Sequence, residues 1–308
     1  MKYQIYKLKF DSGVHFGKRN LDDSDINFHA DTLFSALCQE ALKLGGVENL
    51  KHLVQLTKED HLLLSDAMPY VNDQLFLPKP FIHVDSKENR GDSSVKKKIK
   101  KMKYVQLELL EAFINGEYPM DKALKTDDLV KQQMKTSVAI RGREETEPYR
   151  VNSIYFEEGC GLYIITASSD DETASYLEGL LESLSYSGIG GKRSAGFGRF
   201  KLCRSPMKQE YQKRIVAKGH IYMALSLSLP KEKELPGVLN GASYQLIKRS
   251  GFVASDTYSK EYLRKKDLYV FNSGSCFDYK FQGDVFDVSS GGTHPVYRYA
   301  KPMFLGVR

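Results

Sequence analysis

The stretch VNSIYFEEGCGLYIITASSDDETASYLEGLLESLSYSGIGGKRSAGFGRFKLC, residues 151–203, decides the expected fold. Two apolar runs flank Gly159-Cys160-Gly161, which predicts a β-hairpin over Arg150–Ala167. Ser169 and Glu172 then have the spacing of a capping box, and leucines between 177 and 184 recur at helical spacing. A glycine-rich loop follows, and RFKLC resumes as a strand. The stretch therefore predicts the order strand–strand–helix–strand.

The first fifty residues supply the other half of this pattern. Tyr3–Phe10 alternates apolar and basic residues, as a half-buried strand does. FHADTLFSALCQEALKLGG, residues 28–46, predicts a helix with Asp31 as its cap and an end at Gly45-Gly46. Combined with residues 151–203, the order is that of the split βαβ, or ferredoxin-like, unit. RNA-binding proteins of the RRM type use such a sheet.

The segments between and after these elements are less regular. We expect a short helix over Leu50–Leu64, an extended segment over Gln74–Pro80, and a long helix from Val95 through KKKIKKMKYVQLELLEAFING. Six of the eight residues 96–103 are lysine, and this run could either neutralise RNA phosphates or form a solvated helix face. Beyond about Lys218, strand-like segments separated by Gly, Pro and Ser predict a second, β-rich unit.

The loop SGIGGKRSAGFGRF, residues 187–200, holds five glycines within eleven residues. Such density would free backbone N–H groups to face an anion, with Lys192 and Arg193 adding positive charge. The loop is not a P-loop, because Arg193 stands where Ser or Thr belongs after Gly191-Lys192, and it also lacks the last glycine of a dinucleotide fingerprint. The alternative is a flexible surface loop, in which five glycines would carry an entropic cost.

Charge is unevenly placed along the chain. The 308 residues include 45 Lys+Arg and 39 Asp+Glu, a net charge of +6, and 41% are hydrophobic, which excludes intrinsic disorder. Residues 144–186 carry ten acids and one base, whereas residues 192–218 carry nine bases and one acid. Because the basic block adjoins the glycine-rich loop, it favours nucleic-acid contact. The acidic block indicates a face toward solvent or a partner.

The cysteines and the chain start bear on compartment and metal binding. Cys38, Cys160, Cys203 and Cys276 are more than forty residues apart, so no zinc clip is indicated. The start MKYQIYKLKF lacks the apolar run of a signal peptide, and no apolar stretch approaches the length of a membrane span. We expect a cytoplasmic protein with reduced thiols and no metal site.

Several motifs resemble one known family. GIGGKRSAGFGRF after the second helix of a ferredoxin-like unit is similar to the signature of the CRISPR RAMP proteins. The remaining landmarks are YKLKFDSGVHFGKRNL, FHADTLFSALCQEAL, MPYVNDQLFLPKPF, VAIRGREETEPYRV and GGTHPVYRYAKPMFLGV. Together they resemble, in order and over essentially the whole chain, the fourth subunit of the type III-A CRISPR (Csm) effector complex.

This resemblance implies an α+β fold of two tandem ferredoxin-like (RRM-like) RAMP domains, residues 1–217 with the glycine-rich loop and the β-rich residues 218–308. It implies a non-catalytic subunit, with no cofactor, that binds the 5′ repeat-derived tag of the CRISPR RNA and docks on the large polymerase-like subunit and the backbone RAMP subunit. The resemblance also implies that the region around Arg141-Gly142-Arg143 and Arg150 forms a thumb-like hairpin near the junction of tag and guide. The candidate RNA-binding residues are Lys18, Arg19, Arg141, Arg143, Arg150, Gly188, Gly190, Gly191, Lys192, Arg193, Ser194, Gly196, Phe197, Gly198 and Arg199.

Two other functions remain open at this point. Some RAMP relatives cleave RNA without a metal, and His15 or His29 could act as general acid/base, with Lys18 and Arg19 stabilising the phosphorane charge. Asp22, Asp23 and Asp25 lie in the loop where such relatives carry a catalytic aspartate, although DDSD is also typical of a turn. The third function is a scaffold that docks partners through the acidic block and contacts RNA little.

Overall fold

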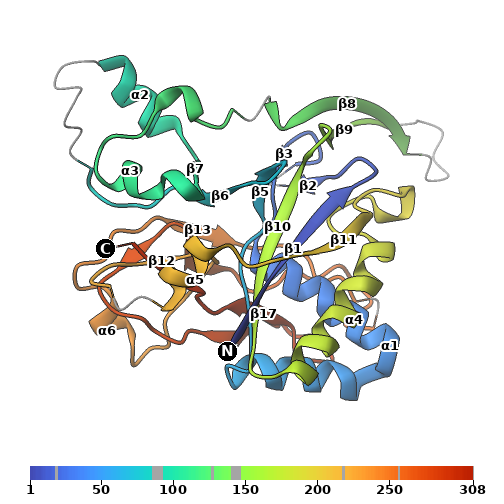
Figure 1. Ribbon diagram of the computed structural model, residues 1–308. Coiled ribbons are helices and arrows are strands. Elements are labelled where there is room, and N and C mark those ends of the chain that lie inside the picture. The colour runs from blue at the N-terminus through green and yellow to red at the C-terminus, as the bar shows by residue number, and fades with distance from the viewer. Residues whose placement is uncertain are drawn as a thin grey trace.

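Strand β1 (Lys2–Phe10) lies inside a seven-stranded antiparallel sheet at the centre of the molecule (Figure 1). The computed structural model describes residues 1–17, 20–84, 93–125, 128–139, 147–216, 219–255 and 257–307. The strand order is β11-β1-β10-β5-β6-β7, and β4 also pairs with β10. The other strands are β4 (Leu62–Leu64), β5 (Met68–Val71), β6 (Gln74–Pro78), β7 (Tyr104–Gln106), β10 (Cys160–Ser168) and β11 (Phe200–Ser205).

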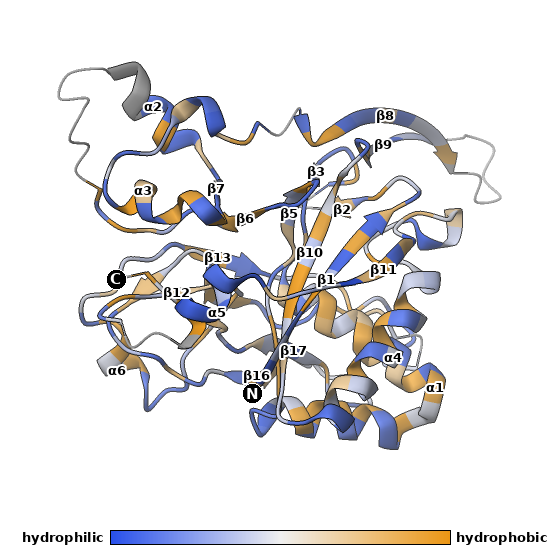
Figure 2. Cartoon of the chain, in the orientation of Figure 1, coloured by the Kyte–Doolittle hydropathy of each residue, from blue (hydrophilic) through white to orange (hydrophobic). Residues whose placement is uncertain are grey.

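Both faces of this sheet pack against other parts of the chain, and its central strand β10 is buried along its whole length. All nine residues of β10 are buried, and the strand is among the most hydrophobic segments in Figure 2. On one face, Tyr6 and Leu8 pack with α1 (Ala30–Lys58) and α4 (Asp171–Ser187). On the other face, Ile5 and Ile165 pack with residues of the C-terminal third. The expected Tyr3–Phe10 strand, with Tyr6, Leu8 and Phe10 on one face, is confirmed.

Helix α1 differs from the sequence-based expectation at both ends. Gly45 and Gly46 kink the helix without ending it, because Gly46 takes a positive φ and the chain resumes helical geometry to Lys58. The expected helix over Leu50–Leu64 is therefore the second half of α1 followed by β4. Asp31 does not cap the helix. The carboxylate of Asp66 accepts the Ala30 N–H at 2.8 Å instead, and Asp31 is turned toward two arginines.

Helix α4 begins one residue later than a Ser169 cap would require. The N-cap is Asp170, whose carboxylate accepts the Thr173 N–H at 2.8 Å, so the Ser169/Glu172 capping box is wrong by one position. Asp171 and Glu172 lie in the first turn, where acidic side chains interact favourably with the helix dipole. Leu177, Leu180, Leu181 and Leu184 are buried against the sheet, as the leucine spacing predicts.

The hairpin expected over Arg150–Ala167 is not formed. Strand β9 (Glu147–Phe156) pairs along its full length with β8 (Val130–Ala139), in a separate two-stranded arm along the top of Figure 1. Strand β10 pairs instead with β1 on one side and with β4 and β5 on the other. Because both edges of β10 are occupied, β9 has no place beside it, and Glu157–Gly159 only connects the two strands.

The long helix expected from Val95 is also interrupted. Helix α2 (Ser93–Lys101) ends before β7, whose Val105 pairs with Leu77 of β6, and α3 (Leu110–Ile114) follows after a 3-10 turn at Leu107–Leu109. Tertiary pairing with the sheet edge thus overrides the helical spacing of this segment. The expected extended segment over Gln74–Pro80 is confirmed by β6.

The remaining elements are short. Strands β2 (Phe16–Gly17) and β3 (Ser24–Asp25) pair in the loop after β1. The C-terminal third holds a three-stranded sheet, β15-β12-β18, and the ribbons β13–β14 and β16–β17. Its elements are α5 (Gln209–Val216), β12 (Tyr222–Ala224), α6 (Leu235–Val238), β13 (Leu246–Arg249), β14 (Leu268–Phe271), β15 (Cys276–Phe277), β16 (Asp284–Asp287), β17 (Tyr297–Ala300) and β18 (Phe304–Gly306).

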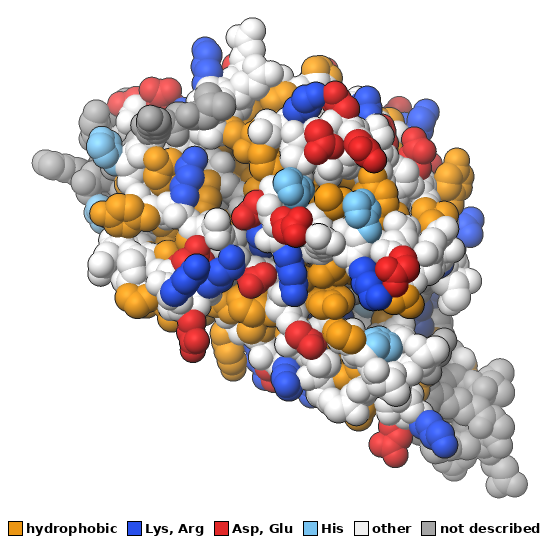
Figure 3. Space-filling model, turned by 90° about the horizontal axis from the view of Figure 1, so that it is seen from below, with side chains coloured by type: hydrophobic (Ala, Val, Ile, Leu, Met, Phe, Trp, Pro, Cys, Tyr) orange, Lys and Arg blue, Asp and Glu red, His pale blue; other side chains and the backbone are white. Residues whose placement is uncertain are grey.

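The C-terminal third shares its core with the rest of the chain. Val285 and Tyr299 belong to the same hydrophobic cluster as α1 and α4, and Met223 and Leu305 belong to the cluster on the opposite sheet face. On the face seen from below in Figure 3, acidic and basic side chains are interspersed. Over the described residues, no helix has the length and apolarity that a membrane span needs.

Candidate nucleic-acid interface

The glycine-rich loop packs closely against the segment after β1. A side chain on Gly190 would meet the His15 carbonyl at 2.7 Å, and one on Gly191 would meet the His15 ring at 2.8 Å. Gly188 has a φ of 78°, and a side chain there would meet the Phe197 carbonyl at 2.6 Å. The glycines therefore permit a tight fold of the loop on itself and on residues 13–17.

Much of the loop's backbone is engaged within the protein. The Gly191 N–H donates to His15 at 2.8 Å, the Gly198 N–H to Gly13 at 2.9 Å, and the Ile189 N–H to Gly198 at 3.0 Å. The N–H groups of Gly188, Gly196 and Phe197 also donate to carbonyls of the chain. These six N–H groups shape the loop rather than face an anion, contrary to the use we expected for them.

The basic side chains of the loop have different surroundings. Lys192 takes a left-handed conformation and donates to the Tyr149 hydroxyl at 3.0 Å, with its Nζ 4.5 Å from the centre of that ring. It thus ties the loop to β9. Arg193 donates to Gln39 of α1 at 2.9 Å. Arg199 and Ser194 are exposed.

Other predicted contact residues are placed less favourably or lie outside the described residues. Phe197, one of the candidate RNA-binding residues, is half-buried, and its ring lies over Gly13. Arg150 is exposed on β9, opposite Thr136 of β8. Lys18, Arg19, Arg141 and Arg143 lie outside the described residues.

A large groove begins at the loop and brings together residues distant in sequence. Its volume is about 1260 Å³, and it runs from Gly190, Gly191 and Arg193 past the start of α1 to residues 100–104 at the start of β7 and to β13. Three aspartates line it: Asp25, Asp31 and Asp66. Its basic lining residues are Lys79, Lys100, Lys101, Lys103, Arg193, Lys248, Arg249, Lys265 and Arg298.

These nine basic residues outnumber the three acids and make the groove electropositive. Part of the lysine run at 96–103 is thereby placed in the groove, since Lys100, Lys101 and Lys103 are exposed and line it. Lys79 is held between them and the sheet by donating to the carbonyls of Ile99 and Lys100 at 3.0 and 3.2 Å. Burial lowers the pKa of Lys79 from its ordinary value. A groove of this sign suits an anionic strand.

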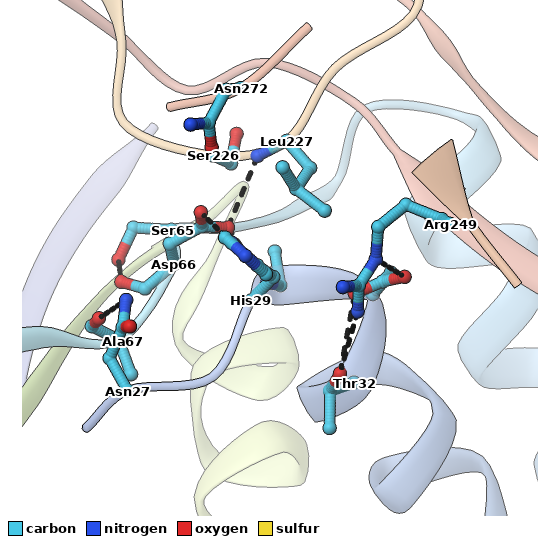
Figure 4. Close-up of polar contacts among 12 residues, drawn as sticks. Asn27, His29, Thr32, Ser65, Asp66, Ala67, Ser226, Leu227, Arg249 and Asn272 are labelled. Atoms are coloured by element: carbon cyan, nitrogen blue, oxygen red, sulfur yellow. Dashed lines mark hydrogen bonds and ion pairs between the residues drawn. The ribbon is translucent and has the colours of Figure 1, made fainter. Parts of the chain in front are cut away.

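The groove floor is organised by Asp66 (Figure 4). Its Oδ1 accepts the Ala30 N–H at 2.8 Å and the Leu227 N–H at 3.1 Å, which joins α1 to the C-terminal third. Its Oδ2 lies 2.6 Å from Nδ1 of His29. Asp66 is 1% exposed, so this carboxylate is a fixed, buried acceptor.

A second buried carboxylate, Asp31, holds two arginines beside the groove. Arg249 of β13 binds it through Nε at 2.9 Å and Nη2 at 2.8 Å, and Arg298 of β17 binds it through Nη1 at 2.7 Å. Burial would raise the pKa of Asp31, but the guanidiniums of Arg249 and Arg298 outweigh it and hold that pKa well below the ordinary range. The cluster therefore stays ionised and ties β13 and β17 to α1.

Sequence reasoning missed the C-terminal contribution to this groove. Lys248, Arg249, Lys265 and Arg298 lie more than two hundred residues from Asp31 along the chain. No local spacing in the sequence links these four residues. Among the motifs that resemble the family, only GGTHPVYRYAKPMFLGV includes one of them, Arg298. The signal that pointed to the groove was the lysine run, which the sequence left open between RNA contact and a solvated face.

The two histidines considered for catalysis have different positions. His15 is 4% exposed, with its Nδ1 2.8 Å from the Asn152 carbonyl and its ring packed between Gly17 and Gly191. His29 lines the groove and keeps 22% of its side chain exposed. Asp22 and Asp23 are exposed in the loop between β2 and β3, while Asp25 lines the groove. Among the described residues, no group of three His, Cys, Asp or Glu side chains could hold a metal ion.

Known protein families and individual proteins match this chain over nearly its whole length. Residues 7–201 match the RAMP superfamily, and residues 217–307 match the CRISPR Csm4 C-terminal domain. A CRISPR system protein Csm4 from Mycobacterium tuberculosis is 39% identical over 309 residues, covering 100% of this chain and 98% of that protein. The chain belongs to the Csm4 family. The Csm4 protein of Streptococcus thermophilus is 35% identical, covering 99% of this chain and 98% of its own length. The resemblance inferred from the motifs is confirmed.

Chains from solved CRISPR complexes have a similar fold. One comes from a Csm3–Csm4 subcomplex of the type III-A CRISPR-Cas interference complex, with a TM-score of 0.69, 19% identity and 98% coverage of both chains. Another comes from a Csm1–Csm4 cassette in complex with pppApA, with a TM-score of 0.66, 19% identity, and coverage of 100% of this chain and 98% of that one. With the RAMP match over residues 7–201, these structures show that the chain has a RAMP superfamily fold of mixed α and β content.

Proposed function

We propose that this chain is the RNA-binding Csm4 subunit of a type III-A CRISPR effector complex, acting in the cytoplasm. In this role it holds the 5′ repeat-derived tag of the CRISPR RNA and docks on the large subunit and the backbone RAMP subunit. Support for the partners comes from similar chains, which occur in a Csm3–Csm4 subcomplex and in Csm1–Csm4 cassettes. The observation that carries RNA binding is the groove lined by nine basic residues and three acids.

The proposal extends to the domain organisation. The strand order β11-β1-β10-β5, with α1 and α4 on one face, supports a ferredoxin-like unit within residues 1–217. Residues 218–308 would form the second, β-rich unit, and the groove lies where the two meet. Lys18, Arg19, Arg141 and Arg143 remain proposed RNA contacts beside Arg150, Arg193, Ser194 and Arg199.

A groove that binds RNA through its phosphates predicts a measurable salt dependence. We expect the triple variant Lys100→Ala/Lys101→Ala/Lys103→Ala to bind single-stranded repeat RNA about 10- to 100-fold more weakly at physiological salt. The slope of log K against log salt should fall by about 2, because each lost phosphate contact on a single strand removes roughly 0.7. Fluorescence anisotropy at four salt concentrations measures both quantities.

The matched control is Lys9→Ala/Lys51→Ala/Lys233→Ala, which removes the same charge from exposed lysines outside the groove lining. It should leave the slope within about 0.5 of that of the wild-type chain, since those lysines do not line the groove. An equal loss in both triple variants would refute the groove as the RNA site and leave only non-specific attraction by net charge.

The competing function is metal-independent RNA cleavage. Of the two histidines, His29 is the one exposed in the groove, and its pairing with Asp66 is the observation that favours this activity. Incubation of the purified chain with repeat RNA decides the matter. We expect intact RNA, whereas cleavage that disappears in His29→Ala would replace the binding role by an enzymatic one.

A further inference from the structure

His29 is a partly exposed titratable side chain of the groove to which phosphate binding assigns no role. It precedes α1 directly, lines the groove and keeps 22% of its side chain exposed. Its Nδ1 lies 2.6 Å from Oδ2 of Asp66, which is 1% exposed (Figure 4). Asp66 is fixed in turn by the N–H groups of Ala30 and Leu227. The imidazole is therefore held in one orientation by a buried, immobile partner.

This contact determines which hydrogen-bonding group the ring presents. Both oxygens of a carboxylate are acceptors, so Nδ1 of His29 must be the donor in the contact with Asp66. In the neutral ring, Nε2 then carries a lone pair and is an acceptor. None of the described residues hydrogen-bonds Nε2. The neutral ring thus offers the groove one acceptor of fixed orientation, in a lining whose charged side chains are mostly lysines and arginines.

An acceptor at this place selects for a particular part of a nucleic acid. A phosphate has only acceptor oxygens and finds its partners in the lysines and arginines of the groove. A ribose 2′-hydroxyl can donate to a lone pair, and it is the group that distinguishes RNA from DNA at a given site. We propose that His29, positioned by Asp66, accepts a hydrogen bond from a ribose 2′-hydroxyl and makes the groove selective for RNA over DNA. The inference rests on the proposed RNA-binding function and names a contact within it.

The test is a selectivity ratio measured on the full chain. One probe is single-stranded repeat RNA, and the other has the same bases, uracil included, on 2′-deoxyribose. We expect wild-type protein to bind the RNA about five- to tenfold more tightly than the deoxy strand, as one hydrogen bond allows. His29→Asn should lower this ratio to about 1 to 2 while changing affinity for the deoxy strand less than twofold. Asparagine retains a donor where Nδ1 lay, which preserves the Asp66 contact, but it has no atom at the Nε2 position.

His52→Asn is the matched control, because His52 is an exposed histidine of α1 and does not line the groove. Its ratio should equal that of the wild-type chain. Two results would overturn the inference: a ratio unchanged in His29→Asn, or an equal loss of affinity for both probes, which would make His29 merely structural. The inference would also be overturned if the binding affinity changed with base identity but not with 2′-deoxy substitution. His29 would then accept a hydrogen bond from a base amino group.

Failure of this inference is distinguishable from failure of the proposed function. If the triple lysine variant loses affinity and salt slope while His29→Asn keeps its ratio, the groove binds RNA and only the 2′-hydroxyl contact is wrong. If the lysine variant binds RNA as the wild-type chain does, the groove itself is not the RNA site, and both proposals are wrong.

Discussion

Replacement of Asp31 by alanine is expected to lower the free energy of unfolding by about 3–5 kcal/mol, the cost of leaving a buried ion without its partner. Arg298 is 5% exposed, and its Nη1 lies 2.7 Å from Asp31, while Arg249 binds both oxygens of the same carboxylate. Alanine would leave the buried guanidinium of Arg298 and the partly exposed guanidinium of Arg249 without their shared anion. Because the cluster joins β13 and β17 to α1, the loss acts on the attachment of the C-terminal third. Urea denaturation followed by circular dichroism measures it.

The matched control is Asp171→Ala. Asp171 forms an ion pair with Lys2 of comparable length, 2.6 Å, but the two side chains are 84% and 60% exposed. We expect a loss below about 1 kcal/mol, because water screens exposed pairs and replaces their hydrogen bonds. Equal losses in the two variants would contradict the account, since burial would then have no part in the effect.

The Asp31 cluster also predicts a pH dependence of stability. The native pKa of this carboxyl lies well below its ordinary value of 3.8, because Arg249 and Arg298 outweigh the effect of burial. Its contribution to stability is therefore complete above 3.8 and is lost as the pH falls from that value toward the native pKa. We expect the wild-type chain to lose stability more steeply than Asp31→Asn between about pH 4 and about pH 2, which urea titrations across that range measure. Parallel curves for the two proteins would disprove the assignment.

Replacement of Gly198 by alanine is the second change with a large expected effect, about 2–5 kcal/mol. Gly198 has a φ of 78°, which costs an alanine roughly 1–2 kcal/mol. A side chain there would also collide with the backbone carbonyl of Ile189, and crowding of this kind adds about 1–3 kcal/mol. The Ile189 N–H donates to the Gly198 carbonyl, so the collision acts on the bond that closes the loop. Thermal and urea denaturation measure the loss.

Two other glycines allow the cost of the positive φ at Gly198 to be separated from the cost of the collision with Ile189. Gly196 has a φ of 84°, but a side chain there would meet nothing within 4 Å, so Gly196→Ala should cost only about 1–2 kcal/mol. Gly179 lies within α4 with open space around it, and Gly179→Ala should stabilise the chain by about 0.4–1 kcal/mol. If Gly198→Ala cost no more than Gly196→Ala, the tight packing of the loop would have no energetic consequence.

The elements predicted well are those in which apolar side chains recur at the spacing of a strand or a helix. The strand at Tyr3–Phe10, the leucine face of α4, and the strand after the glycine-rich loop all follow local periodicity, and the structure confirms them. The hairpin over Arg150–Ala167 was wrong because two adjacent apolar runs do not specify which strand each one joins. Strand β10 had partners on both edges from distant parts of the chain, and β9 paired with β8 instead.

The candidate site was predicted only in part. The glycine-rich loop and Arg193 do border the groove, and the lysine run reaches it through Lys100, Lys101 and Lys103. The expected use of the glycines was different, since the described N–H groups of the loop largely serve its own folding. The role given to Asp31 was wrong because a capping position and a buried ion pair look the same in sequence when the arginines lie more than two hundred residues away.

By itself, the sequence determined the family and the local elements, because motifs and periodic side chains act over short distances along the chain. Only the tertiary structure decided the site. Pairing across the sheet brought the start of α1, the loop after α4, the lysines near β7 and the arginines of β13 and β17 to one groove. Coulomb and hydrogen-bonding interactions depend on distance in space rather than along the chain, so the contacts of His29 with Asp66 and of Asp31 with Arg249 and Arg298 required the folded protein.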